Sequence, residues 1–130
     1  MLLEQKLVIG HSALPGIAST IIGYDSCPLI GTLKIDGQVI LFWSPDVPGS
    51  RMRFAYAELT VEEVSKLASY FENSADMQAR YDNHPLFMNR RVVVGLTEGW
   101  LLSQIAVIEN PSPMLLDEIN KLFPVPDEDE

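Results

Sequence analysis

The sequence predicts an α+β domain in which two to three helices pack on a twisted antiparallel sheet of about five strands, in the order α-β-β-β-α-β-β-α. The first observation behind this prediction is a turn signal, Asp36-Gly37, between two runs of β-forming residues. The second is a capped, amphipathic stretch at Thr60–Glu72, with strand patterns on both sides of it. A chain of 130 residues can form one domain with a sizeable core, which we place at residues 1–123, before a tail at 124–130.

The predicted sheet is built on a hairpin around that turn. A two-residue type I′ turn needs a positive φ at both central positions, which Gly37 adopts without steric cost and Asp36 adopts more readily than most residues. The turn also sets the register of the two strands. The register pairs Ile35 with Gln38, Leu33 with Ile40, Gly31 with Phe42 and Ile30 with Trp43. The second strand, Val39–Trp43, is apolar on both faces, so we expect it to lie inside a sheet that is covered on both sides.

The segments before the hairpin have weaker patterns. Leu2–Ile9 suits either a helix or a strand, because its apolar residues fit both periods. Leu14-Pro15-Gly16 is a break, Ile17–Tyr24 is predicted to be a short extended segment, and Asp25–Pro28 is predicted to be a turn. After the hairpin, the proline-containing stretch Ser44–Ser50 is predicted to be a loop.

A strand with alternating side chains is predicted at Arg51–Leu59. One of its faces carries Met52, Phe54 and Tyr56. The other face, which we expect to be a mixed outer face, carries Arg51, Arg53, Ala55 and Ala57.

The clearest helix is predicted at Thr60–Glu72. Thr60 and Glu63 form a capping box, in which each side chain accepts a hydrogen bond from a free backbone N–H at the start of the helix. The apolar residues of the helix fall on one stripe, formed by Val61, Val64, Leu67, Ala68 and Phe71. A second short helix at Ser74–Asp82 is expected to end at Asn83-His84-Pro85, because the residue before a proline leaves the helical region.

Two more strands and a last helix complete the prediction. The strands are Arg90–Leu96 and Trp100–Glu109, joined by a turn at Thr97-Glu98-Gly99, although the second pattern also suits a helix. Ser112 caps the last helix and Pro113 takes its first position. The apolar face of that helix is Leu115, Leu116, Ile119, Leu122 and Phe123. A proline ends it, and the tail, which finishes in four acidic residues, is expected to be disordered.

Charge and composition argue against several classes of partner. The chain has 18 acidic and 9 basic residues, a net charge of −9. Nucleic acids and anionic membranes attract a basic face, so neither is an expected partner. The apolar runs are shorter than the ~18 residues of a membrane-spanning helix, and no signal-peptide pattern is found, so the expected location is the cytoplasm. Cys27 is the only cysteine, which fits a reducing compartment.

No catalytic or cofactor site is predicted. His11, Ser12 and Cys27 lack a recognisable nucleophile motif, and His84 precedes a proline in a polar loop, where a capping or surface role is more common. The sequence has no cysteine pair, no His-x-x-x-His and no acidic loop of the calcium type, so neither a metal nor another cofactor is expected. We therefore expect a binding protein rather than an enzyme.

Several stretches of the chain resemble one known family. Residues 25–37 resemble a first strand that runs from an acidic turn through a cysteine to an Ile/Val-Asp-Gly turn. Gln38–Trp43 and Arg51–Leu59 match the second and third strands, and Thr97–Glu109, with a helix over Pro113–Phe123, resembles the last strand and helix. The family is that of the class I type III secretion chaperones, the Tir-chaperone-like family. The chain departs from it in a short first helix and in a longer polar stretch before the last two strands.

The resemblance implies a bacterial cytoplasmic homodimer that binds no nucleotide and holds the N-terminal segment of a secreted effector in an extended form. In the family, the central helix and the strand after it make the dimer contact. Here this implies Leu67, Tyr70, Phe71, Val92 and Val94. The apolar second face of the sheet needs cover, so we expect the client to bind there. The expected client-binding residues are Leu41, Trp43, Met52, Phe54 and Tyr56.

A different class of function fits the same size and charge. A small acidic immunity protein can block the active site of a basic toxin nuclease, with an association that is steered by charge. An effector gene beside the gene for this chain would favour the chaperone, and a toxin gene would favour the inhibitor.

Overall fold

The computed structural model describes residues 2–10, 12–14, 17–24, 27–46, 49–70, 85–111 and 114–125. In chain order the elements are helix α1 (Leu3–Gly10), strands β1 (Ile17–Tyr24), β2 (Cys27–Ile35), β3 (Gln38–Trp43) and β4 (Arg51–Glu58), helices α2 (Val61–Ser65) and α3 (Leu67–Tyr70), the short 3₁₀ helix η1 (Pro85–Phe87), strands β5 (Val92–Glu98) and β6 (Leu101–Ile108), and helix α5 (Leu115–Leu122). Within these ranges, no helix has the length and apolar character needed to cross a bilayer.

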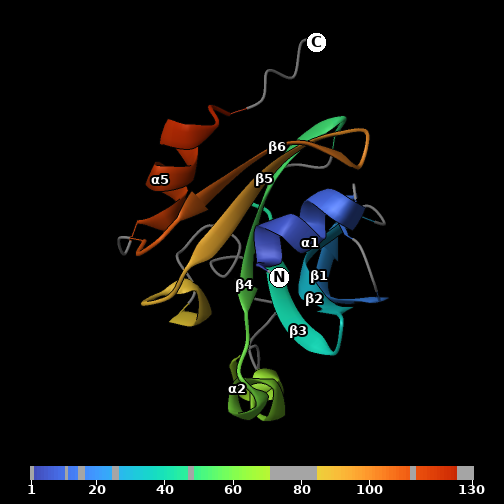
Figure 1. Cartoon of the computed structure of the whole chain (residues 1–130), viewed down its shortest axis with the longest axis vertical. Helices are drawn as coiled ribbons and strands as arrows, with labels where there is room; N and C mark the ends of the chain where they lie inside the picture. Colours follow the sequence, from blue (N-terminus) through green and yellow to red (C-terminus); the bar gives the residue numbers. More distant parts are fainter. Residues whose placement is uncertain are drawn as a thin grey trace.

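Six strands form one antiparallel sheet, in which each strand pairs with its neighbours in the sequence, from β1 at one edge to β6 at the other. Figure 1 shows the twisted sheet between α5 on one side and α1 on the other. The predicted α+β class is therefore confirmed. The sheet has one strand more than expected, because Ile17–Tyr24, predicted only as an extended segment, pairs with β2 as strand β1.

The hairpin of β2 and β3 has the predicted turn and register. The φ angles of Asp36 and Gly37 are 52° and 80°, as a type I′ turn requires. All of the predicted residue pairs are present in the β2–β3 ladder. Strand β3 also pairs with β4, so it lies inside the sheet, and its residues 40–43 are buried.

Each face of the sheet has its own hydrophobic core. The core on the side of α5, called here the α5-side core, includes Leu41, Trp43, Ala55, Val94, Leu115 and Ile119. The core on the side of α1, the α1-side core, includes Leu3, Leu7, Phe42, Phe54, Tyr56 and Val93. Neighbouring residues of one strand belong to different cores because successive side chains point to opposite faces. Both faces of the central strands are thus covered by elements of the same chain.

The N-terminal segment, for which the sequence left helix and strand open, forms helix α1. Leu3 and Leu7 lie one helical turn apart, and both are buried in the α1-side core. The chain that follows α1 contacts the β5–β6 turn, where the backbone N of Ala13 donates to the carbonyl O of Trp100 at 2.8 Å. The buried hydroxyl of Tyr56 donates to the carbonyl O of Ala13 at 2.6 Å, and burial raises the pKa of this hydroxyl.

The helix predicted over Thr60–Glu72 begins as expected and is interrupted early. The capping box of Thr60 and Glu63 is present, with N–O distances of 2.9 and 3.1 Å. Lys66, with a φ of −105°, separates α2 from α3. Val61, predicted to lie on the apolar stripe, is 89% exposed, so that part of the stripe was wrong. In the described part of this stretch, Val64 and Leu67 pack against the α5-side core, and both are only partly buried.

The C-terminal elements follow the prediction more closely. Residues 101–108 form strand β6 rather than the alternative helix, and α5 buries Leu115, Ile119 and Phe123. Leu122 is 42% exposed, so the apolar face of α5 is narrower than predicted. The start of α5 differs from the prediction, because its N-cap is Met114, without a side-chain hydrogen bond, rather than Ser112 with Pro113 at the first position. Several predicted features lie outside the described residues: Phe71, the helix at Ser74–Asp82, its end at Asn83-His84 and the tail from Pro126 onward.

Candidate functional site

The residues expected to bind a client do not share one surface. Leu41 faces Ala57 and Trp43 faces Ala55 in the β3–β4 ladder, which places both in the α5-side core. The other three, Met52, Phe54 and Tyr56, belong to the α1-side core on the opposite face. All five are at most 2% exposed. The expectation of an exposed aromatic surface was wrong because helices of the same chain cover both faces.

The residues expected at the dimer contact are also internal where the structure describes them. Strand β5 pairs with β4 on one side and β6 on the other, and Val92 and Val94 are fully buried in the α5-side core. Leu67 is half-buried and packs against the same core. The side chain of Tyr70 and all of Phe71 lie outside the described residues. Val92 and Val94 therefore stabilise the fold of one chain, and any dimer contact must use other residues.

The least expected cluster surrounds Arg53, whose side chain is 2% exposed. Its Nη2 donates to Oδ1 of Asp46 at 2.6 Å, and its Nε donates to Oδ2 at 3.0 Å. Its Nη1 donates to the carbonyl O of Phe123 at 3.0 Å and to Oδ1 of Asn120. The backbone N of Arg53 also donates to Oδ2 of Asp46 at 2.7 Å. One guanidinium thus joins strand β4, the loop after β3 and the end of α5.

The Arg53 cluster corrects the prediction of a mixed outer face on β4. The strand alternates as predicted, but the face that carries Arg53 is covered by α5. A buried arginine is stable only with its charge paired and its N–H groups bonded, and this one has both. Four hydrogen bonds from its guanidinium go to groups of the same chain, so the cluster connects parts of the fold to one another. The sequence offered no local signal, because Asn120 and Phe123 are distant along the chain.

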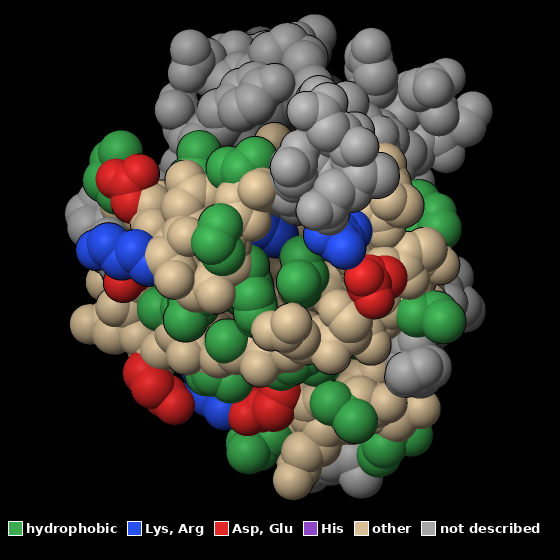
Figure 2. All heavy atoms as spheres, turned by 90° about the horizontal axis from the view of Figure 1, so that it is seen from above, with side chains coloured by type: hydrophobic (Ala, Val, Ile, Leu, Met, Phe, Trp, Pro, Cys, Tyr) green, Lys and Arg blue, Asp and Glu red, His purple; other side chains and the backbone are tan. Residues whose placement is uncertain are grey.

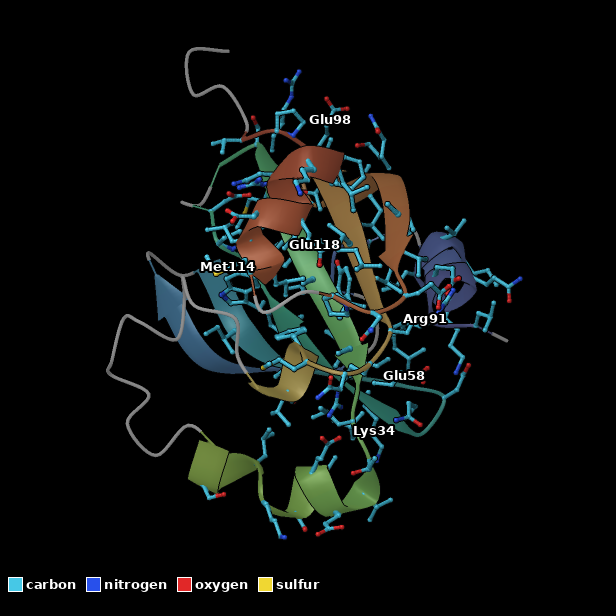
Figure 3. All side chains as sticks on the ribbon, turned by 90° about the vertical axis from the view of Figure 1, so that its left-hand side faces the viewer. Lys34, Glu58, Arg91, Glu98, Met114 and Glu118 are labelled. Atoms are coloured by element: carbon cyan, nitrogen blue, oxygen red, sulfur yellow. The ribbon has the colours of Figure 1, made fainter. Side chains whose placement is uncertain are left out.

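Two further arginines fasten helices to the sheet. Arg90 contacts both carboxylate oxygens of Glu63, which ties the start of α2 to the segment before β5. The hydrogen bonds from Arg90, with weaker help from Thr60, lower the pKa of Glu63 to about 2. Arg91 contacts Glu4 of α1 in the same way and lowers the pKa of that carboxyl. Figure 3 shows Arg91 between α1 and the sheet.

The candidate catalytic residues are not brought together in the described part of the chain. The hydroxyl of Ser12 accepts from the backbone N of Leu14 at 3.3 Å, which is a turn contact. His11, His84 and the side chain of Cys27 lie outside the described residues. Within the described ranges, no group of three or more His, Cys, Asp or Glu side chains could hold a metal ion.

Exposed apolar side chains occur mainly at helix α1 and at the β5–β6 turn. Nine large hydrophobic residues of the described chain are exposed, and five of them lie on α1, beside its start or at the β5–β6 turn. These five, called here the α1–β6 patch, are Leu2, Val8, Ile9, Trp100 and Leu101. Helix α1 lies beside β6 in Figures 1 and 3, and the two elements are in contact. On the face seen in Figure 2, Lys and Arg side chains are scattered among acidic and hydrophobic ones rather than gathered together.

No protein-family model, curated protein or solved structure shows significant similarity to this chain.

Proposed function

We propose that the protein is a chaperone of the bacterial cytoplasm that binds the extended N-terminal segment of a type III secretion effector and keeps it competent for secretion. One observation carries the proposal: the sheet is open, and each of its outermost strands, β1 and β6, has one neighbour among the described strands. An open strand edge offers backbone N–H and C=O groups to an extended segment, which then adds to the sheet. The resemblance of the sequence to the Tir-chaperone-like family supports the same mode of binding.

An edge suits such a client better than a face of this sheet does. Both faces are occupied by helices of the same chain, and the aromatic residues of the central strands are buried. Strand addition needs no open face, because backbone hydrogen bonds supply affinity and alternate side chains of the client give specificity. The sequence of strand β1, Ile17–Tyr24, contains no charged residue. The proposed activity is binding without catalysis and without a cofactor.

The test uses the N-terminal segment of a secreted protein encoded beside this chain, as a synthetic peptide. Binding is expected to slow amide hydrogen exchange in an edge strand and to change little between low and high salt. The matched control is the same peptide with N-methyl groups at alternate residues, which cannot donate to the edge and should bind much more weakly. Binding that is abolished by high salt, or that leaves the exchange of both edge strands unchanged, would contradict the chaperone proposal.

A second candidate, an acidic immunity protein that inhibits a basic toxin nuclease, is supported by the pairing of the arginines. Every arginine of the described chain has an acidic partner: Arg51 pairs with Glu98, Arg53 with Asp46, Arg90 with Glu63, and Arg91 with Glu4 and Glu109. None of these arginines presents an unpaired positive charge that would repel a cationic partner, and the net charge of −9 would attract one. This candidate predicts inhibition of a co-encoded nuclease, with an association rate that falls steeply as salt rises.

A further inference from the structure

Helix α1 is attached to the sheet by few side chains. It has eight residues, and helices of this length are marginal in water without tertiary contacts. Leu3 and Leu7 are the two residues that it buries, both in the α1-side core. Val8 and Ile9 of the α1–β6 patch are 59% and 69% exposed. The helical form of α1 therefore depends on a small area of contact with the rest of the chain.

An ion pair holds the start of α1. Nη1 of Arg91 donates to Oε1 of Glu4 at 2.6 Å, and Nη2 of Arg91 donates to Oε2 of Glu4. A two-point contact of this kind has a defined geometry, so it orients the helix as well as attaching it. Nε of Arg91 also lies 3.5 Å from Oε1 of Glu109, the residue after β6. Both side chains of the Glu4–Arg91 pair are partly exposed, so water reaches the contact.

The chain beyond α1 is held by a separate set of contacts. The backbone N of Ala13 donates to the carbonyl O of Trp100 at 2.8 Å, and the carbonyl O of Ala13 accepts from the hydroxyl of Tyr56 at 2.6 Å. Ala13 is fully buried, and neither hydrogen bond involves a residue of α1. The start of α1 can therefore leave the sheet while Ala13 stays in place, which makes Ala13 a pivot.

An apolar strip of the sheet lies on the face that α1 covers. Alternation along the chain places Arg91 and Val93 on the same face, and Val93 faces Val107 of β6 in the ladder. Ile105 and Val107 are only partly buried, and both pack against the α1-side core, which contains the buried leucines of α1. Helix α1 contacts β6 and runs in front of the sheet in Figure 1. Val93, Ile105 and Val107, called here the β6 strip, are thus apolar side chains with Arg91 at their end.

We propose that α1 is a lid. When the Glu4–Arg91 pair breaks, α1 turns about Ala13, and the β6 strip binds an amphipathic segment of the client in the place of α1. The closed lid competes with the client, because both need the same strip and the same arginine. The inference rests on the proposed function and deepens it, since it adds a regulated site on one face beside the edge of β6.

The chemistry of α1 indicates what the client segment carries. Leu3 and Leu7 lie one helical turn apart and supply the apolar contacts, and Glu4 supplies the carboxylate for Arg91. A segment that replaces α1 needs the same pattern, because a client without a carboxylate would leave Arg91 without the partner that the closed lid provides. The expected occupant is therefore an amphipathic helical segment with two apolar residues four positions apart and an acidic residue next to the first.

Amide hydrogen exchange of the full chain tests the lid without a client. Amides of Lys6–Ile9 are expected to exchange faster than that of Ala13 and to depend little on low urea, because opening α1 exposes little surface. The amide of Ala13 is expected to follow the steep urea dependence of β3. Glu4→Gln is expected to speed exchange in α1 by about five- to tenfold, since the ion pair no longer resists opening. Glu109→Gln, which removes the other carboxylate beside Arg91, is the matched control and should leave α1 unchanged.

Three results of this measurement would overturn the lid. Exchange of α1 with the urea dependence of β3 would show that α1 opens only when the whole domain unfolds. Equal exchange of α1 and Ala13 would show that Ala13 is no pivot. Equal effects of Glu4→Gln and Glu109→Gln would show that the ion pair does not hold α1. Circular dichroism of both variants checks that their folds are intact.

A synthetic peptide with the sequence of residues 2–10 then probes the β6 strip. It is expected to bind full-length Glu4→Gln more tightly than wild type, by the same factor as the faster exchange, because apparent affinity scales with the open fraction. The peptide with serine in place of Leu3 and Leu7 is the control and should bind much more weakly. Equal binding of the two peptides, equal affinity for the two chains, or no binding to either chain would contradict the site. Binding of a client at a strand edge is measured separately with the N-methylated peptide, so the two proposals fail independently.

Discussion

Arg53 and Asp46 form a buried, two-point ion pair that holds the loop after β3 against β4. The same guanidinium bonds to α5 through Asn120 and the carbonyl O of Phe123. Helix α5 covers the α5-side core. This single side chain therefore links the helix that covers that core to the loop between β3 and β4.

Arg53→Ala is expected to destabilise the fold by about 3–5 kcal/mol, because it leaves the carboxylate of Asp46 buried without a partner. Urea unfolding measures the effect. Lys66→Ala is the matched control, since Lys66 pairs with Glu62 at an exposed position and such pairs contribute about 0–1 kcal/mol. Equal, small effects of the two substitutions would show that Arg53 is not buried as described.

Acid is expected to weaken the contact between α2 and the segment before β5. The pKa of Glu63 is lowered from 4.5 to about 2 by Arg90, so the folded state holds this carboxylate charged where the unfolded state has already bound a proton. The stability from this group is fully present above pH 4.5 and is lost as the pH falls from 4.5 towards 2. Glu63→Gln should be less stable than wild type at neutral pH. Its urea midpoint should fall less steeply than that of wild type as the pH is lowered over that range. Glu62→Gln, on the exposed side of α2, should keep the wild-type slope.

Phe54→Asp is expected to prevent folding rather than to test client binding. Phe54 is fully buried between Phe42, Tyr56 and Trp100, with ring centroids 6.2 Å from each. An unpaired carboxylate there costs several kcal/mol, which is a large part of the stability of a small domain. Val61→Asp is the matched control, because Val61 is 89% exposed and its replacement should leave the melting temperature nearly unchanged. A folded Phe54→Asp variant by circular dichroism would contradict the described core.

Local chemistry explains which parts of the fold the sequence could predict. The register of β2 and β3 follows from Asp36-Gly37 alone, since a two-residue turn leaves one pairing. The capping box of Thr60 and Glu63 is equally local. Alternation within one strand was also predictable, because it is fixed by strand geometry. The faces of neighbouring strands were not matched correctly, since Trp43 and Phe54 were expected on one surface and lie in different cores.

What covers each face could not be predicted, because it depends on contacts between distant segments. The alternation on β4 placed Arg53 and Phe54 on opposite faces correctly, but it could not show that α5 and α1 cover those faces. The same limit made Trp43 and Val94 look available to partners when both are internal. The sheet edges, rather than its faces, are therefore the candidate binding sites, because strand order leaves backbone groups unpaired at β1 and β6.

The tail and the end of α5 are expected to contribute unequally to the stability of the fold. Deleting Asp127–Glu130 is expected to leave the melting temperature nearly unchanged, because consecutive acidic residues have no apolar surface to bury. Ending the chain at Leu122 is expected to lower it by many degrees, because Phe123 is 8% exposed and its carbonyl accepts from Arg53. Calorimetry of the two truncated chains compares them directly. A large loss from the shorter deletion would show that the acidic tail is docked, and a negligible loss from the longer one would show that Arg53 does not need Phe123.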